Sequence, residues 1–81
     1  MTMIQIEAST LPDLLAATRR LLGLSMRAMG ERLGVAHTTI AAWEHGVSEP
    51  SFSQVVTWAR LTGQPLSVFV DALGRDYQSE G

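Results

Sequence analysis

The sequence predicts an all-α protein, a compact bundle of five helices with either a short β-strand or an irregular arm at its N-terminus. The chain has 81 residues, of which 46% are hydrophobic, so it can bury one core and is too short for a second domain. Side chains recur at helical spacing in five segments, separated by glycine, proline or a capping residue. Such short connections are typical of a small helical bundle.

The first two helices are predicted from their capping residues. Thr10 can cap a helix in which Pro12 occupies the first turn and Asp13 favours the positive helix end. Before the break at Gly23, the side chains at helical spacing are Leu14, Leu15, Thr18, Leu21 and Leu22. Ser25 is the next capping residue, and the helix that it starts is expected to end at Gly34.

The third and fourth helices follow on either side of a short connection. The third covers about residues 36–45, with Ile40 and Trp43 on one face, and ends at Gly46. Pro50 and Ser51 introduce the fourth helix. Its inward-facing residues are expected to be Phe52, Val55, Val56, Trp58 and Ala59.

The fifth helix is expected to be short. Gly63 and Pro65 interrupt the helical pattern, Ser67 can cap a new helix, and Gly74 is expected to end it. The apolar residues of this helix are Val68, Phe69, Ala72 and Leu73. The sequence therefore predicts an ordered domain over residues 10–74, followed by a flexible tail over residues 75–81.

Residues 1–9 show a different pattern. Ile4 and Ile6 alternate with Gln5 and Glu7, and this period of two indicates a strand. A strand is not stable alone, so it would pair with a second copy of the chain. The alternative is an N-terminal arm without regular structure.

Composition excludes several classes of function. The chain has no cysteine, which rules out disulfides, thiol catalysis and thiolate metal sites. His37 and His45 have no carboxylate at ligand spacing, and we find neither a nucleophile–base pair nor a phosphate-binding glycine loop. No apolar run is long enough to span a membrane, and the N-terminus lacks the basic stretch followed by an apolar one that is typical of a signal peptide. We therefore expect a cytoplasmic protein that is not an enzyme and needs no metal or cofactor.

The charges are distributed unevenly along the chain. The formal net charge is −2, which by itself argues against a nucleic-acid partner. Residues 19–60, however, hold five arginines against three glutamates, a local net charge of +2. A phosphate responds to this local potential, and arginine suits forked contacts with phosphate or guanine. The distribution of charge therefore fits two interpretations: the arginines belong to an ordinary solvated surface, or they contact a nucleic acid.

Residues 26–45 have the spacing of a helix-turn-helix unit. Gly30 has no side chain, so the following helix can approach closely, and Gly34 can adopt the positive φ that ends a helix. The apolar residues at the offsets that bury the angle between the two helices are Met29, Leu33, Val35, Ile40 and Trp43.

Over about residues 12–73, the sequence resembles the Cro and phage-repressor type of helix-turn-helix domain, also called the xenobiotic-response-element family. The matching motifs are residues 19–25 (RRLLGLS), 34–35 (GV), 39–40 (TI), 43–46 (WEHG) and 50–51 (PS). The resemblance implies a lambda-repressor-like fold over residues 10–74 and double-stranded DNA as the partner. The sequence departs from the family at Met26 and His37, where many relatives have glutamine, and at residues 47–49 (VSE), which are often basic.

The resemblance also implies roles for individual residues. The third helix would enter the major groove, and its candidates for base contacts are His37, Thr38, Ala41 and Ala42. The candidates for phosphate contacts are Ser25, Arg27, Thr39, His45 and Ser48. Arg19 and Glu44 would form an ion pair that ties the first helix to the end of the third.

We therefore expect a transcriptional regulator, a repressor that binds a palindromic operator as a homodimer. Its size also suits a regulator of a phage or mobile element, or an antitoxin with a toxin as partner. The dimer would form either through the N-terminal segment around Ile4 and Ile6 or through the fifth helix. The candidate residues of that helix are Leu66, Phe69, Val70 and Leu73. The alternative is a protein-interaction module that keeps the fold without binding DNA.

Overall fold

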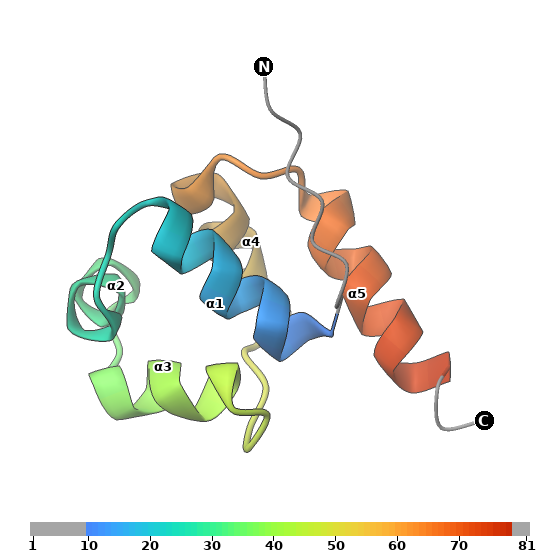
Figure 1. The fold of residues 1–81 in the computed structure, drawn as a ribbon, viewed down its shortest axis with the longest axis horizontal. Coiled ribbons are helices and arrows are strands. Elements are labelled where there is room, and N and C mark those ends of the chain that lie inside the picture. The colour runs from blue at the N-terminus through green and yellow to red at the C-terminus, as the bar shows by residue number, and fades with distance from the viewer. Residues whose placement is uncertain (1–9, 79–81) are drawn as a thin grey trace.

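The computed structural model describes residues 10–78, with side chains for residues 10–74. This part of the chain forms five α-helices and no strand, as the sequence predicts. The helices are α1 (Leu11–Leu21), α2 (Met26–Leu33), α3 (His37–Glu44), α4 (Phe52–Thr62) and α5 (Leu66–Gln78). Figure 1 shows α1 at the centre, with α2 and α3 on one side and α5 on the other. The strand expected near Ile4 and Ile6 lies outside the described residues.

Short-range hydrogen bonds start three of the helices at the predicted positions. The side chains of Thr10 and Ser25 each accept a hydrogen bond from the backbone N–H three residues later, at 3.3 and 3.0 Å. Ser51 does the same at 3.2 Å, and the side chain of Gln54 accepts the N–H of Ser51 at 2.7 Å, which completes a capping box. These contacts satisfy backbone donors that a helix start leaves unpaired.

The turn between α2 and α3 depends on two glycines. Gly34 caps α2 with a φ of 74°, a left-handed conformation that side chains rarely adopt. Gly30 lies where the backbone of the turn crosses α2, and a Cβ atom there would be 2.6 Å from the carbonyl oxygen of Val35. The absence of a side chain at Gly30 therefore permits the close packing of the two helices.

Alanine substitutions at two helical glycines are expected to have opposite effects. Gly30→Ala should lower the free energy of unfolding by about 1–2 kcal/mol. The energy needed to move the backbone at Val35 away from the new Cβ is expected to exceed the gain in helix propensity. Gly74→Ala should raise it by about 0.5–1 kcal/mol, because a Cβ there meets nothing within 4 Å. Urea denaturation followed by circular dichroism measures both. Stabilisation by Gly30→Ala would contradict the close approach.

The hydrophobic core receives side chains from all five helices, and α2 contributes the fully buried Met29. Trp58 and Phe69 are fully buried at its centre, and the rings of Trp43 and Trp58 meet at 6.2 Å and 59°. The indole N–H of Trp58 donates to Oγ1 of Thr18 at 2.9 Å, and this hydroxyl donates to the carbonyl of Leu14 at 2.8 Å. Within the described side chains, every buried nitrogen or oxygen has a hydrogen-bond partner.

Three apolar residues do not face the core as the sequence predicts. Phe52 is 65% exposed, and Leu21 and Leu22 are 55% and 42% exposed. They lie in the first turn of α4 and at the end of α1. Helical periodicity assigns such residues to a face, but it does not show whether a neighbouring element reaches the end of that helix.

The predicted bounds of the last helix are also wrong. The helix α5 begins at Leu66, so Ser67 lies in its first turn rather than capping it. It continues past Gly74 to Gln78. Gly74 is not among the glycines with positive φ, and without that conformation a glycine only lowers helix propensity.

Candidate nucleic-acid interface

The helix α3 buries one face and exposes the other. Ile40 and Trp43 are 0% and 4% exposed, and both belong to the hydrophobic core. The opposite face carries the four residues expected to contact bases. His37 and Thr38 are exposed, and Ala41 and Ala42 are half-buried. The structure thus brings the four residues together on the outward face of one anchored helix.

The side chains of His37 and Thr38 make no hydrogen bond within the described residues. Both lie in the first turn of α3, whose N-cap residue, Ala36, makes no side-chain hydrogen bond to the helix. An imidazole and a hydroxyl can each donate and accept, so both can pair with groups outside the chain. The two alanines behind them add no polar group and leave room for a close approach of another surface.

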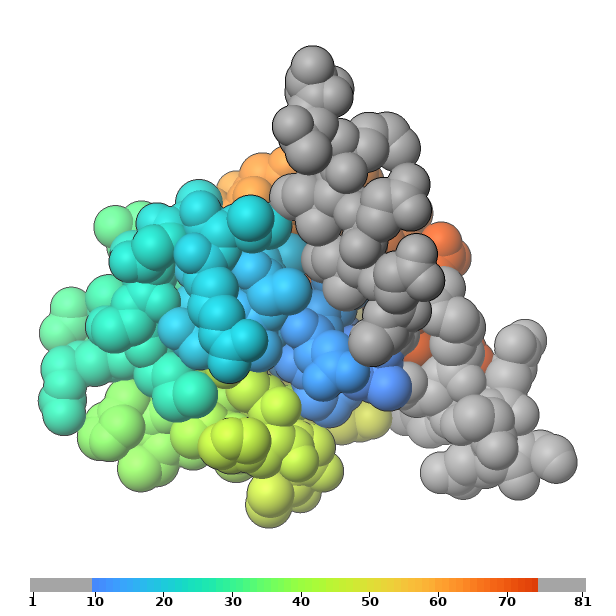
Figure 2. Space-filling view, viewed as in Figure 1, coloured from blue at the N-terminus to red at the C-terminus, as the bar shows by residue number. Residues whose placement is uncertain are grey.

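The five residues expected to contact phosphate lie on three elements. Ser25 and Arg27 are exposed at the start of α2, and Thr39 is half-buried in the first turn of α3. His45 and Ser48 are exposed beyond the end of α3. Figure 2 shows α2, α3 and the α3–α4 connection along one continuous edge of the molecule. These candidates are therefore spread along that edge rather than gathered at one point.

Arg19 and Glu44 form a buried bidentate ion pair. Nε of Arg19 lies 2.6 Å from Oε2 of Glu44, and Nη2 lies 2.9 Å from Oε1. The two side chains are only 9% and 2% exposed. The hydrogen bonds to Glu44 raise the pKa of Arg19 above its usual value, so the guanidinium stays charged.

A third contact of Arg19 is not evident from the sequence. Nη1 donates to the carbonyl oxygen of Leu24 at 2.8 Å, immediately before Ser25 caps α2. One guanidinium therefore joins the end of α1, the start of α2 and the end of α3. The sequence indicates the pair with Glu44, but a backbone acceptor carries no signal in side-chain identity.

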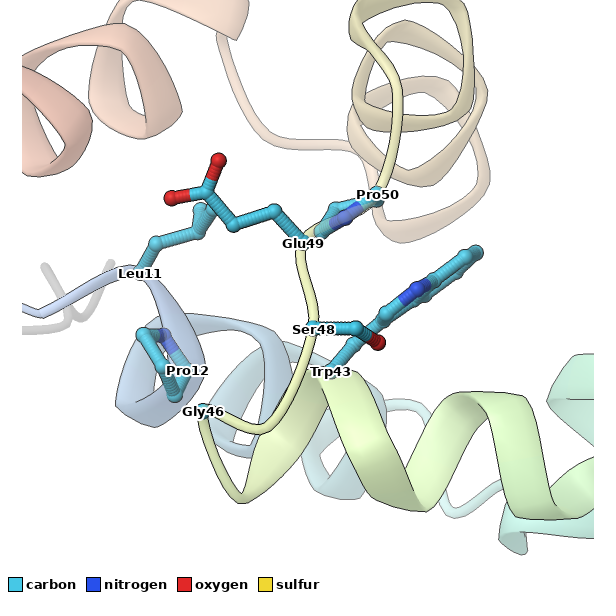
Figure 3. A pocket seen from close by; sticks show the side chains of 7 residues that line it. All are labelled: Leu11, Pro12, Trp43, Gly46, Ser48, Glu49 and Pro50. Atoms are coloured by element: carbon cyan, nitrogen blue, oxygen red, sulfur yellow. The ribbon is translucent and has the colours of Figure 1, made fainter.

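A cavity of about 170 Å³ opens between the start of α1 and the α3–α4 connection. Figure 3 shows the seven lining residues, with Glu49 extending toward Leu11 and Pro12 beside Gly46. The other lining residues are Trp43, Ser48 and Pro50. Glu49 supplies the single carboxylate of this lining, and no histidine, arginine or second acid accompanies it. The lining therefore does not form an acid–base pair.

The described residues contain no group of three histidine, aspartate or glutamate side chains placed to hold a metal ion. None of the helices over residues 10–78 has the length and apolar character required to cross a bilayer.

Comparison with known proteins agrees with this geometry. A helix-turn-helix family model matches residues 15–69. The fold is similar to that of the P22 c2 repressor protein, which was crystallised in complex with synthetic operator 9T in the presence of Tl⁺. The TM-score is 0.71 and the identity is 19%, over 78% of this chain and 96% of that chain. At this identity the similarity is one of fold. No curated protein matches the sequence.

The family model covers more than half of the chain, including α2, the turn and α3. The sequence motifs, the family match and the five-helix fold agree with one another. The chain belongs to the helix-turn-helix family of the Cro and phage-repressor type, a family of DNA-binding regulators and not of enzymes.

Proposed function

We propose that this chain is a sequence-specific repressor that binds double-stranded DNA by placing the N-terminal half of α3 in the major groove. The observation that carries the proposal is the division of α3 into two faces. Ile40 and Trp43 anchor the helix in the core, while His37 and Thr38 are exposed and unpaired within the described residues. A rigid helix with free hydrogen-bonding groups at its N-terminal end suits the reading of base edges.

The residues of the outward face would have different roles. His37 and Thr38 would form hydrogen bonds with base edges. Ala41 and Ala42 have only methyl groups, which can pack against a thymine methyl or let the helix approach the bases. Specificity would then depend on two polar side chains, supplemented by the fit of a small apolar surface.

Phosphate contacts would hold the protein in register on the duplex. Arg27 is the cation best placed at the start of α2, and Ser25, Thr39, His45 and Ser48 would add neutral or weakly basic contacts. The connection after α3 carries Glu49 and no lysine or arginine between residues 46 and 51. With so few cations, each copy should bind with modest affinity and shallow salt dependence.

Two copies bound to the half-sites of a palindromic operator would compensate for a weak single contact. Occupying a promoter would exclude polymerase, so repression would need no further domain. The bound operator of the P22 c2 repressor supports this mode of action for a similar fold. A regulator of this kind also suits a phage, a mobile element or a toxin–antitoxin pair, in which a toxin would be a further partner.

Selection of bound duplexes from a random-sequence DNA pool tests the proposal. We expect enrichment of a symmetric motif whose half-sites lie about one helical turn apart. Titration of the selected duplex at two salt concentrations should give a log–log slope shallower than about −8. A lack of enrichment over non-specific DNA would instead favour a protein-interaction module with the same fold.

Two kinds of substitution should separate base contacts from phosphate contacts. Arg27→Ala should weaken binding to all duplexes similarly and reduce the magnitude of the salt slope by about 0.9. His37→Ala or Thr38→Ala should instead relax preference at particular base pairs by about 1–3 kcal/mol. Fluorescence anisotropy with selected and point-altered duplexes measures both effects.

Arg60→Ala is the matched control, because this arginine is exposed on α4 and belongs to none of the proposed contacts. It should leave both affinity and preference unchanged. If Arg27→Ala altered sequence preference while His37→Ala had no effect, the assigned docking face would be wrong.

A further inference from the structure

The cavity between the start of α1 and the α3–α4 connection has the size of a small organic molecule. Its volume of about 170 Å³ is close to the roughly 150 Å³ of an engineered protein cavity that binds benzene. The apolar side chains of its lining are Leu11, Pro12, Trp43 and Pro50. Leu11 and Trp43 are buried members of the hydrophobic core, which supports this part of the lining. The cavity can therefore take an apolar group about as large as one aromatic ring.

The backbone around this cavity is held in place. The ring of Pro12 fixes its own φ, and a Cβ atom on Gly46 would lie 3.6 Å from Cγ of Pro12. The backbone N–H groups of Val47 and Ser48 both donate to the carbonyl oxygen of Ala42, at 2.9 and 3.3 Å. These bonds attach the α3–α4 connection to α3. A cavity that exists before its ligand arrives spends little free energy on ordering its walls.

Glu49 brings one carboxylate to this apolar cavity. Its side chain is exposed and extends toward Leu11 (Figure 3). Within the part of the chain that the structure describes, no cation forms an ion pair with this carboxylate. Ligand sites are commonly apolar, with one or a few polar groups that fix the orientation of the ligand. The chemistry of this lining therefore suits an apolar molecule that carries one positive charge.

We propose that this cavity binds a small organic cation, a primary amine on an apolar body about the size of one aromatic ring. The ammonium group donates hydrogen bonds to the carboxylate of Glu49, and the apolar body lies against Leu11 and Pro12. An ion pair with an exposed carboxylate is weak, so most of the affinity comes from burial of the apolar body. For a ligand of about eight non-hydrogen atoms, we expect a Kd of about 1 mM.

Occupancy of the cavity strengthens DNA binding, a step that rests on the proposed function. Glu49 directly follows Ser48, one of the proposed phosphate contacts. Its negative charge repels the phosphates of a bound duplex, and the ammonium of the ligand neutralises this charge. By linkage, DNA raises the affinity for the amine by the same factor. The amine would therefore act as a co-repressor.

Titration with benzylammonium chloride, followed by nuclear magnetic resonance of the backbone amides, tests the site in the free protein. The signals of Gly46, Ser48 and Glu49 should shift with a Kd of about 1 mM, while that of Gly63 at the opposite end of α4 should not. Benzyl alcohol, which lacks the charge, should bind about threefold more weakly. Methylammonium, which lacks the ring, should bind more than about tenfold more weakly. Absence of these shifts at about 20 mM benzylammonium would overturn the inference.

Glu49→Gln removes the charge and keeps the size of the side chain. It should weaken the binding of benzylammonium about threefold and leave that of benzyl alcohol unchanged. Asp71→Asn is the matched control, because this acid is exposed on α5 and does not line the cavity. It should leave both affinities unchanged. If Glu49→Gln bound benzylammonium as tightly as the wild type does, the assigned ion pair would be wrong.

Fluorescence anisotropy with the selected duplex tests the effect on DNA binding. We compare about 10 mM benzylammonium chloride with the same concentration of methylammonium chloride, so that the ionic strength is constant. The wild type should bind DNA about threefold more tightly in benzylammonium. Glu49→Gln should bind more tightly than the wild type in methylammonium and should not respond to benzylammonium. Equal affinities of the wild type in the two salts, or an undiminished response of Glu49→Gln, would contradict the coupling.

The two proposals can fail separately. If the wild type selects no duplex, the proposed function and the effect on DNA fail together, and the titration of the free protein still decides whether the cavity binds the amine. If the chain binds DNA but the amide signals at the cavity do not shift, the inference fails and the proposed function stands.

Discussion

Replacement of Arg19 by methionine is expected to lower the free energy of unfolding by about 3–5 kcal/mol. The substitution leaves the carboxylate of Glu44 only 2% exposed and without its two hydrogen bonds from the guanidinium. It also removes the donor to the carbonyl oxygen of Leu24. A small domain has a total stability of about 5–15 kcal/mol, so the loss is a large fraction of the whole.

Urea denaturation followed by circular dichroism measures this loss, with Arg20→Met as control because the adjacent arginine is exposed. The control should change stability by less than about 0.5 kcal/mol. The double variant Arg19→Met/Glu44→Leu should be more stable than Arg19→Met alone, because no buried charge remains unpaired. A loss below about 1 kcal/mol for Arg19→Met would mean that the pair behaves as a solvated surface contact.

Replacement of Trp58 by alanine is expected to cost about 3–5 kcal/mol of stability. The indole is fully buried, lies against the ring of Trp43 and donates to Thr18. Alanine would leave a cavity at the centre of the core and remove the donor to Oγ1 of Thr18. The same urea titration measures the loss, and a cost below about 1 kcal/mol would contradict the central position of this ring.

The stability that the hydrogen bond between Trp58 and Thr18 contributes can be measured separately from that of the packing of the indole. Thr18→Val should cost about 1–3 kcal/mol, because it leaves the buried indole N–H without an acceptor. In a Trp58→Phe background the same substitution should cost less, since no N–H remains to be satisfied. Thr57→Val is the exposed control and should have little effect. If Thr18→Val cost the same stability in both backgrounds, the hydrogen bond would contribute no coupling energy between Thr18 and Trp58.

The starts of three helices could be predicted because their causes are local. Thr10, Ser25 and Ser51 each bond to a backbone group three residues away. The outward face of α3 could also be predicted, since Ile40 and Trp43 define the buried side and helical geometry places Thr38 opposite. His37 is three residues before Ile40, and its exposure is not given by the helical period alone. Such features require only the helical period and the preference of each residue type.

Other features could not be predicted because their causes are distant in the chain. Trp58 and Thr18 are 40 residues apart, and nothing in either residue type indicates that their side chains meet. Phe52 fits the apolar stripe of its helix and is nonetheless 65% exposed among the described residues, whereas Val55, three residues later, is buried. Gly74 is typical of a helix end, yet α5 continues beyond it.

The sequence by itself determined that the chain forms five helices, where three of them are capped, and which face of α3 is available to a partner. Only the tertiary structure decided that Arg19 also holds the backbone at Leu24, and that Val47 and Phe52 lie in solvent rather than in the core. The reason is physical. A cap or a helix face depends on residues within a few positions, whereas burial depends on which other helices occupy the space around a side chain.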